Sequence, residues 1–258
     1  MKELHFSHAY SYAAIVQELT ESQKCLELGL DCEMFEWRAK SGVGFEDHVN
    51  SEFMRKIAKP NKETILHDAI QSVISMSFHT SYKNGFIDEA ISLCLAYGID
   101  QPTWMNEEDI GDHRDDLSEF LDGFLDDLTE ATFYLLFGNR SFLWDFNYML
   151  ANQIEHLPKA EFPELLLRDG VIKRCPSIPG WLKNAVFYRD QGRCQRCYRD
   201  ITGLMSPLRP REVHLDHIIP LNRSGTNDPT NFQLLCDTCN LKKATDASYN
   251  PQKTRPFW

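Results

Sequence analysis

The sequence lacks several features that would assign it to a particular class of protein. It has no run of about 18 or more apolar residues, which excludes a transmembrane helix. The first residues, MKELHFSHAY, contain no apolar core of a secretory signal, so we expect a cytoplasmic protein with no membrane partner. Positive charge is also scarce. The 27 Lys and Arg oppose 38 Asp and Glu, and the net charge of −11 taken alone argues against a nucleic-acid binder.

The shortage of positive charge is confined to one part of the chain. Residues 1–180 carry 15 Lys and Arg against 31 Asp and Glu, a net charge of −16. Residues 181–258 carry 12 against 7, a net charge of +5. Such an asymmetry predicts two domains with different partners. The charge of the whole chain therefore does not exclude nucleic acid as a partner of the C-terminal part.

The acidic part of the sequence is predicted to be helical. Alternating strand patterns are scarce there, and turn signals separate segments of helical length. The clearest pattern predicts one amphipathic helix over residues 113–137, with an apolar face toward a core and an acidic face toward water. An aromatic-rich helix is expected over residues 141–156.

Pro and Gly are frequent just after this helical part, which predicts a domain boundary. We expect at most one short helix there, around residues 161–169, and a further helix over 181–190. The predicted organisation is an acidic helical domain of unknown role, a linker, a basic domain and a tail, at residues 1–160, 161–180, 181–250 and 251–258.

Four of the eight cysteines form two C-x-x-C pairs in the basic segment. These residues are Cys194, Cys197, Cys236 and Cys239. In a reducing compartment, paired cysteines indicate metal ligands rather than disulfides. Four thiolates close a tetrahedral zinc site with no open position, so we expect a structural Zn²⁺ ion that stabilises a small domain.

Between and after the cysteine pairs lie three further motifs. They are Asp216-His217-Ile218-Ile219-Pro220, the isolated Asn231, and Cys236-Asp237-Thr238-Cys239-Asn240 followed by Lys243. In this order and spacing, the region resembles the HNH endonuclease family in its zinc-stapled form. The resemblance covers residues 177–247, and residues 1–160 carry no motif of this kind.

The resemblance implies a fold of two strands and a helix around one catalytic metal. Placed on this sequence, the strands are residues 213–218 and 232–235, and the helix starts at Thr238. The predicted fold class is therefore α+β: a mostly α-helical N-terminal domain followed by a small zinc-bound ββα-metal nuclease domain.

The resemblance also implies a role for each motif residue in hydrolysis of DNA phosphodiesters. His217 would be the general base, because a neutral imidazole can accept a proton from water. Asp216 and Asn240 would hold the catalytic metal, and Asn231 would hold the loop that positions the base. Since Asp216 and Asn240 both offer oxygen, Mg²⁺ or Mn²⁺ is the expected catalytic ion.

Several basic residues of the C-terminal domain are candidates for contacts with DNA phosphates. They are His214, Arg193, Arg196, Arg223 and Lys243. Two alternatives to an independent nuclease stay open. One is a zinc-stapled adaptor that binds nucleic acid without cutting it, and the other is a nuclease subunit that is active only in a larger complex.

The acidic domain has three possible roles on sequence grounds. It can be a scaffold with a solvated acidic face, a docking module for a partner protein, or an inhibitory domain whose acidic face covers the basic nuclease surface. Because nucleases of this family often act in conflicts between bacteria and phages, antiviral defence is the setting that the resemblance implies.

Overall fold

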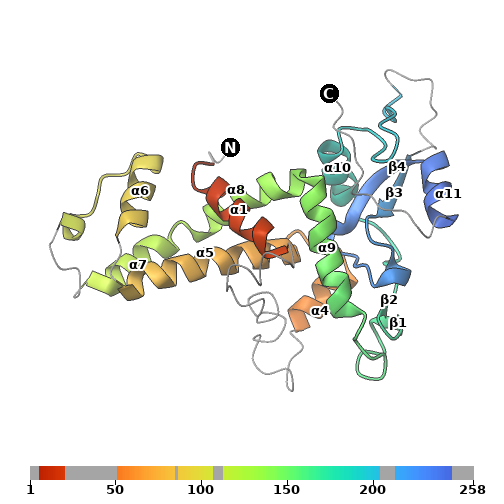
Figure 1. Ribbon diagram of the computed structural model, residues 1–258, viewed down its shortest axis with the longest axis horizontal. Coiled ribbons are helices and arrows are strands. Elements are labelled where there is room, and N and C mark those ends of the chain that lie inside the picture. The colour runs from red at the N-terminus through yellow and green to blue at the C-terminus, as the bar shows by residue number, and fades with distance from the viewer. Residues whose placement is uncertain (1–5, 21–50, 85–86, 107–112, 204–212, 246–258) are drawn as a thin grey trace. The chain divides into compact units, whose positions relative to one another are not determined.

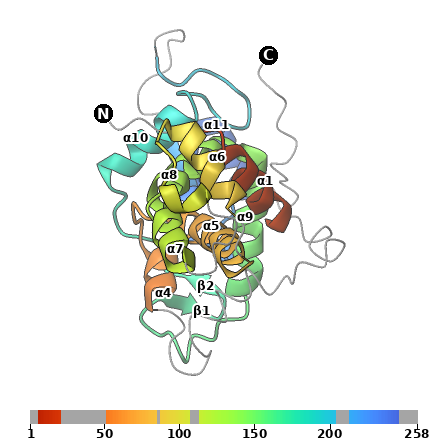
Figure 2. The same ribbon diagram turned by 90° about the vertical axis from the view of Figure 1, so that its left-hand side faces the viewer.

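The computed structural model (Figures 1 and 2) divides into two compact units, each assembled from two stretches of chain. Unit 1 comprises Met1–Leu28 and Leu66–Leu136, and unit 2 comprises Gly29–Ile65 and Phe137–Trp258. The structure describes residues 6–20, 51–84, 87–106, 113–203 and 213–245. The predicted tail at 251–258 lies outside these residues. None of the described helices is both long enough and apolar enough to cross a membrane.

Unit 1 is built from helices. Those in the described residues are α1 (Ala9–Thr20), α5 (Ile65–Asn84, whose first residue ends the first stretch of unit 2), α6 (Asp88–Tyr97), the short 3-10 helix η1 (Thr103–Asn106), α7 (Arg114–Asp122) and α8 (Leu125–Gly138). Apolar side chains at helical spacing form the core of unit 1. Leu117, Leu121 and Leu128, for example, are fully buried. The predicted helical character of this part is confirmed.

The prediction of one continuous helix over residues 113–137 is wrong in one respect, because the structure has two helices there. Helix α7 ends at Asp122, the N–H of Gly123 donates to the carbonyl of Glu119, and α8 starts at Leu125. Glycine is one of the weakest helix formers, so the chain can bend at Gly123 at small cost. The bend leaves Phe124 buried, although it lies between the two helices.

In the described part of unit 2, the first two helices are α4 (Ser51–Ala58) and α9 (Arg140–Ile154). The side chain of Asn139 caps α9 by accepting a hydrogen bond from the N–H of Phe142. The short helix expected around 161–169 does not form, because β1 (Leu166–Arg168) pairs antiparallel with β2 (Val171–Ile172). Gly170 allows the tight connection, since its φ of +63° is unfavourable for other residues.

The C-terminal part of unit 2 contains the two strands and the helix that the resemblance implied. Helix α10 (Gly180–Arg189) precedes the antiparallel pair β3 (Val213–His217) and β4 (Phe232–Cys236), and α11 (Asp237–Thr245) follows. Two 3-10 turns, η4 (Leu221–Arg223) and η5 (Pro229–Asn231), lie in the connection between the strands. Figure 1 shows α10 and α11 beside this small sheet. The α+β fold class is confirmed.

The division into units differs from the boundary expected at residues 161–180. These residues include β1 and β2 and belong to unit 2, together with α9 and α4. The connection between β3 and β4 explains this, because it bonds to early residues. The N–H of Asn227 donates to the carbonyl of Ile57 at 2.8 Å, and the N–H of Ile65 donates to the Asp228 carboxylate at 3.0 Å.

Gly225 lies in this connection at a point where a side chain does not fit. A Cβ atom there would lie 2.0 Å from the carbonyl oxygen of Ile219 and 2.9 Å from that of Pro220. We therefore expect Gly225→Ala to destabilise unit 2 by about 1–3 kcal/mol, measured by thermal or urea unfolding. Gly138→Ala is the matched control, since nothing lies within 4 Å of its Cβ position. Equal stability of the two variants would contradict the close packing of the loop.

Candidate active site and zinc centre

The four paired cysteines come together at one point of unit 2. Cys194 and Cys197 lie in a tight turn after α10, Cys236 ends β4, and Cys239 lies on α11. Their sulfur atoms lie within 4.8 Å of one another, and those of Cys197 and Cys236 are 3.8 Å apart. Zn–S bonds of about 2.3 Å in a tetrahedron give sulfur separations of about 3.8 Å. The cluster therefore fits a structural zinc ion.

The surroundings favour the thiolate form at Cys194, whereas those of Cys197 and Cys239 favour the thiol. Burial alone would raise the pKa of Cys194, but backbone N–H groups of Cys236, Cys197 and Arg196 point at its sulfur, and the pKa is lowered. Burial raises the pKa of Cys197 and of Cys239. A bound zinc ion would keep these two sulfurs deprotonated. None of the six described cysteines forms a disulfide.

His217 lies at the end of β3 and is almost completely buried, with an exposed fraction of 4%. Its ring packs against Phe232, its partner across the sheet, with a centroid separation of 4.5 Å. Its Nε2 lies 3.2 Å from Oδ1 of Asn227. Burial lowers the pKa of His217 to about 4, so the imidazole is neutral at physiological pH. A neutral imidazole can act as a proton acceptor.

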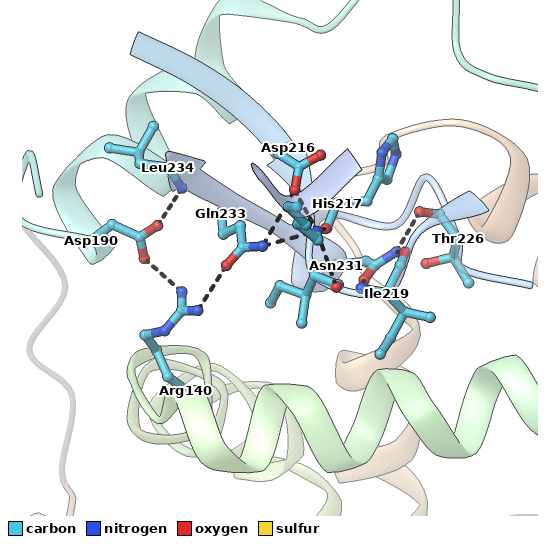
Figure 3. Close-up of polar contacts among 11 residues, drawn as sticks. Arg140, Asp190, Asp216, His217, Ile219, Thr226, Asn231, Gln233 and Leu234 are labelled. Carbon is cyan, nitrogen blue, oxygen red and sulfur yellow. Dashed lines mark hydrogen bonds and ion pairs between the residues drawn. The ribbon is translucent and has the colours of Figure 1, made fainter. Parts of the chain in front are cut away.

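Asn231 holds the loop that follows His217 (Figure 3). Its Oδ1 accepts a hydrogen bond from the N–H of Ile219 at 2.7 Å, and its Nδ2 donates to the carbonyls of Ile219 and Thr226 at 3.0 and 2.9 Å. The Asn231 side chain is fully buried. Its amide therefore replaces water as the partner of three backbone groups and joins the two ends of the loop.

Asp216 precedes His217 on β3, and the side chains of neighbouring strand residues point to opposite faces. Its Oδ2 accepts hydrogen bonds from Nζ of Lys243 and, at 3.4 Å, from Nε2 of Gln233. Lys243 also donates to the carbonyls of His217 and Ile218 and is itself buried. The ammonium group of Lys243, a predicted phosphate contact, thus lies against the carboxylate of Asp216.

Asn240 lies on α11, one turn before Lys243, and is half-buried. Residues three positions apart share one face of a helix. Because Lys243 reaches Asp216 from α11, Asn240 lies on the side of this helix that faces β3. Asp216 and Asn240 both carry oxygen atoms of the kind that Mg²⁺ and Mn²⁺ prefer, and their role as ligands of one ion stays a prediction.

A second layer of polar residues supports β4, the strand that pairs with the one carrying Asp216, and sequence reasoning missed it. Arg140, the first residue of α9, donates to Oε1 of Gln233 at 2.9 Å (Figure 3). Oδ1 of Asp190 lies 3.7 Å from Nη1 of Arg140, and Oδ2 of Asp190 accepts a hydrogen bond from the N–H of Leu234 at 2.7 Å. The one signal in the sequence was Gln233, a polar residue in an otherwise apolar strand.

The remaining predicted DNA contacts lie on the surface or near it. Arg193 and Arg223 are exposed, and Arg196 is half-buried. Nε2 of His214 lies 3.2 Å from Oδ1 of Asp237. The exposed positions of Arg193 and Arg223 are compatible with contacts to a phosphate backbone. All these DNA contacts stay predictions.

Comparison with known proteins identifies the region around this site. Residues 194–246 match the model of the HNH endonuclease family. Together with the cluster of four cysteines, this match confirms a zinc-stapled HNH domain in the C-terminal part of the chain. No curated protein and no solved structure matches the chain.

The zinc centre leads to a prediction for Cys236, which joins β4 to α11. We expect Cys236→Ser to release the zinc ion and to unfold the HNH domain, because four thiolates supply most of the binding free energy of such a site. Zinc content and thermal unfolding measure both effects. Cys175→Ser is the control, since Cys175 lies in the same unit but outside the cluster. Retained zinc and unchanged melting in Cys236→Ser would refute the structural role.

Proposed function

We propose that this protein is a metal-dependent endonuclease that hydrolyses phosphodiester bonds in DNA. The observation that carries the proposal is the neutral imidazole of His217, held next to Asp216 at the end of β3 inside the region that matches the HNH family. Hydrolysis of a phosphodiester requires a group that accepts a proton from water and a cation that neutralises negative charge. This region supplies candidates for both.

His217 is the proposed general base. Its ring is fixed by Asn227 and Phe232, so little reorganisation is needed when it accepts a proton from the attacking water. Asp216 and Asn240 are the proposed ligands of a Mg²⁺ or Mn²⁺ ion. When bound, this ion supplies positive charge that stabilises the phosphate and the leaving oxygen. Asn231 keeps the loop after His217 in place.

DNA is the proposed substrate. The C-terminal residues 181–258 carry a net charge of +5, which attracts phosphates in a salt-dependent way. The exposed Arg193 and Arg223 are proposed phosphate contacts, with His214, Arg196 and Lys243 as further candidates. We further propose that the acidic N-terminal part controls or targets the nuclease, through a partner protein or complex, in the cytoplasm and in defence against foreign DNA.

A second candidate function is a zinc-stapled adaptor that binds nucleic acid without cutting it. One observation favours it: the carboxylate of Asp216, a proposed metal ligand, is already paired with the buried ammonium of Lys243. A metal ion at Asp216 has to share this carboxylate with the ammonium group of Lys243 or displace that ammonium group. A cleavage assay separates the two functions.

The decisive variant is His217→Ala. We expect the wild type to nick or linearise plasmid DNA with Mg²⁺ or Mn²⁺, and the variant to be slower by about 10²–10⁴-fold, the usual contribution of a general base. His156→Ala is the control, since His156 is 80% exposed. An intact plasmid with both wild type and variant, combined with retained DNA binding, would favour the adaptor.

Asn240→Ala tests the second proposed metal ligand. We expect cleavage at limiting Mg²⁺ to fall at least about tenfold and to recover in part at high Mg²⁺, because the ion loses one oxygen ligand. The titration of cleavage rate against Mg²⁺ concentration measures this. Leu241→Ala, at the next and 62% exposed position of α11, is the matched control. An unchanged metal dependence of Asn240→Ala would place the second ligand elsewhere.

A further inference from the structure

Asn227 is the only described residue whose side chain is bonded to the ring of His217. It lies in the connection between β3 and β4 and is fully buried. Its Nδ2 donates to the carbonyl oxygens of Ala58 at 3.0 Å and of Lys173 at 2.8 Å. Its Oδ1 faces Nε2 of His217 at 3.2 Å and the N–H of Cys175 at 3.4 Å.

The partners of Asn227 determine which way its amide points. A carbonyl oxygen can only accept a hydrogen bond, so the NH₂ group must face Ala58 and Lys173. The oxygen of the amide must then face His217. Exchanging the two atoms would set oxygen against two carbonyl oxygens and NH₂ against the N–H of Cys175, so that three of the four partners would be in conflict.

This orientation also determines where the proton of the His217 ring lies. An amide oxygen can only accept, so Nε2 of His217 must carry the hydrogen. In a neutral imidazole the other nitrogen, Nδ1, then holds the free electron pair. Among the residues that the structure describes, none hydrogen-bonds to Nδ1 of His217. This nitrogen is therefore left to accept a proton from another molecule.

Asn227 is anchored by segments far away in the sequence. Ala58 ends helix α4, and Lys173 directly follows β2. The backbone N–H of Asn227 donates to Ile57 at 2.8 Å, so both its main chain and its side chain bond to the end of α4. All these residues belong to unit 2. Asn227 thus links the end of α4 directly to the ring of His217.

We propose that Asn227 is a positioning residue that holds His217 in the tautomer with hydrogen on Nε2, so that Nδ1 is the nitrogen that takes the proton from water. This rests on the proposed function only for the role of Nδ1, since the tautomer is a property of the free protein. Ala58 at the end of α4 and Lys173 after β2 then support catalysis indirectly. Their carbonyl groups orient the amide of Asn227, and this amide orients the ring of His217.

The direct experiment is ¹⁵N NMR of the imidazole groups in the wild-type, zinc-loaded protein at neutral pH without DNA. The His217 signals are assigned by their loss in His217→Ala. We expect hydrogen on Nε2 and an unprotonated Nδ1. Hydrogen on Nδ1, a mixture of tautomers or a doubly protonated ring would overturn the proposal. Because no cleavage is measured, a failed nuclease assay leaves this result unaffected.

Two variants separate the acceptor role of Asn227 from its anchoring role. In Asn227→Asp an oxygen still faces Nε2, but the other oxygen meets the carbonyls of Ala58 and Lys173. We expect this variant to melt at a lower temperature and to keep hydrogen on Nε2. In Asn227→Ala the acceptor is gone, and we expect both tautomers in the NMR spectrum. An unchanged tautomer in Asn227→Ala would overturn the proposal.

A double-variant experiment shows whether Asn227 acts through His217. We expect Asn227→Ala to lower kcat by about 10–10²-fold, within the contribution of a general base, with KM changed less than about twofold. In the His217→Ala background the same substitution should cause no further loss. An equal loss in both backgrounds would mean that Asn227 serves only the fold. Zinc content and melting temperature verify that each variant is folded.

Discussion

The structure of the candidate active site depends on the burial of the loop that connects β3 to β4. Most connecting loops lie on the surface, where water satisfies their backbone groups. Here every residue from 224 to 231 is buried. Each polar group in this loop therefore needs a partner from the protein, and an unpaired one would cost about 1–3 kcal/mol. The side chains of Asn227, Asp228, Thr230 and Asn231 meet this requirement through hydrogen bonds with one another and with the backbone.

This constraint explains why His217 is so well fixed. The zinc centre holds the end of β4 and the start of α11, whereas the buried loop holds the end of β3. Lys243 joins these two supports, because it extends from α11 to Asp216 and to the carbonyl of His217. The two proposed functions of β3, water activation and metal binding, thus depend on two separate supports. A zinc site alone would leave the base free to turn.

The sequence was sufficient for the parts of the site that are local in the chain. The cysteine pairs, the two strands, the helix after them and the position of Asn231 follow from a motif of fixed order and spacing. Residues whose partners are distant were missed. Asn227 looks ordinary in the sequence, and Gln233 differs from its neighbours only as a polar residue in an apolar strand. Their importance comes from Ala58 and Arg140, which no spacing rule connects with them. The bend at Gly123 and the β1–β2 pair were missed because propensity only weakly determines short elements.

The charge asymmetry of the chain now has a narrower meaning. The sign of the charge changes near residue 180, but the compact units change near residues 28, 65 and 137. Helices α4 and α9 are therefore part of the acidic sequence and also part of the unit that holds the candidate active site. They supply Ala58, Arg140 and Asn147 as partners of buried polar groups in that unit. These contacts give α4 and α9 a part in supporting the buried loop and β4. The proposals of docking or inhibition then apply to unit 1, where the acidic faces of α7 and α8 lie.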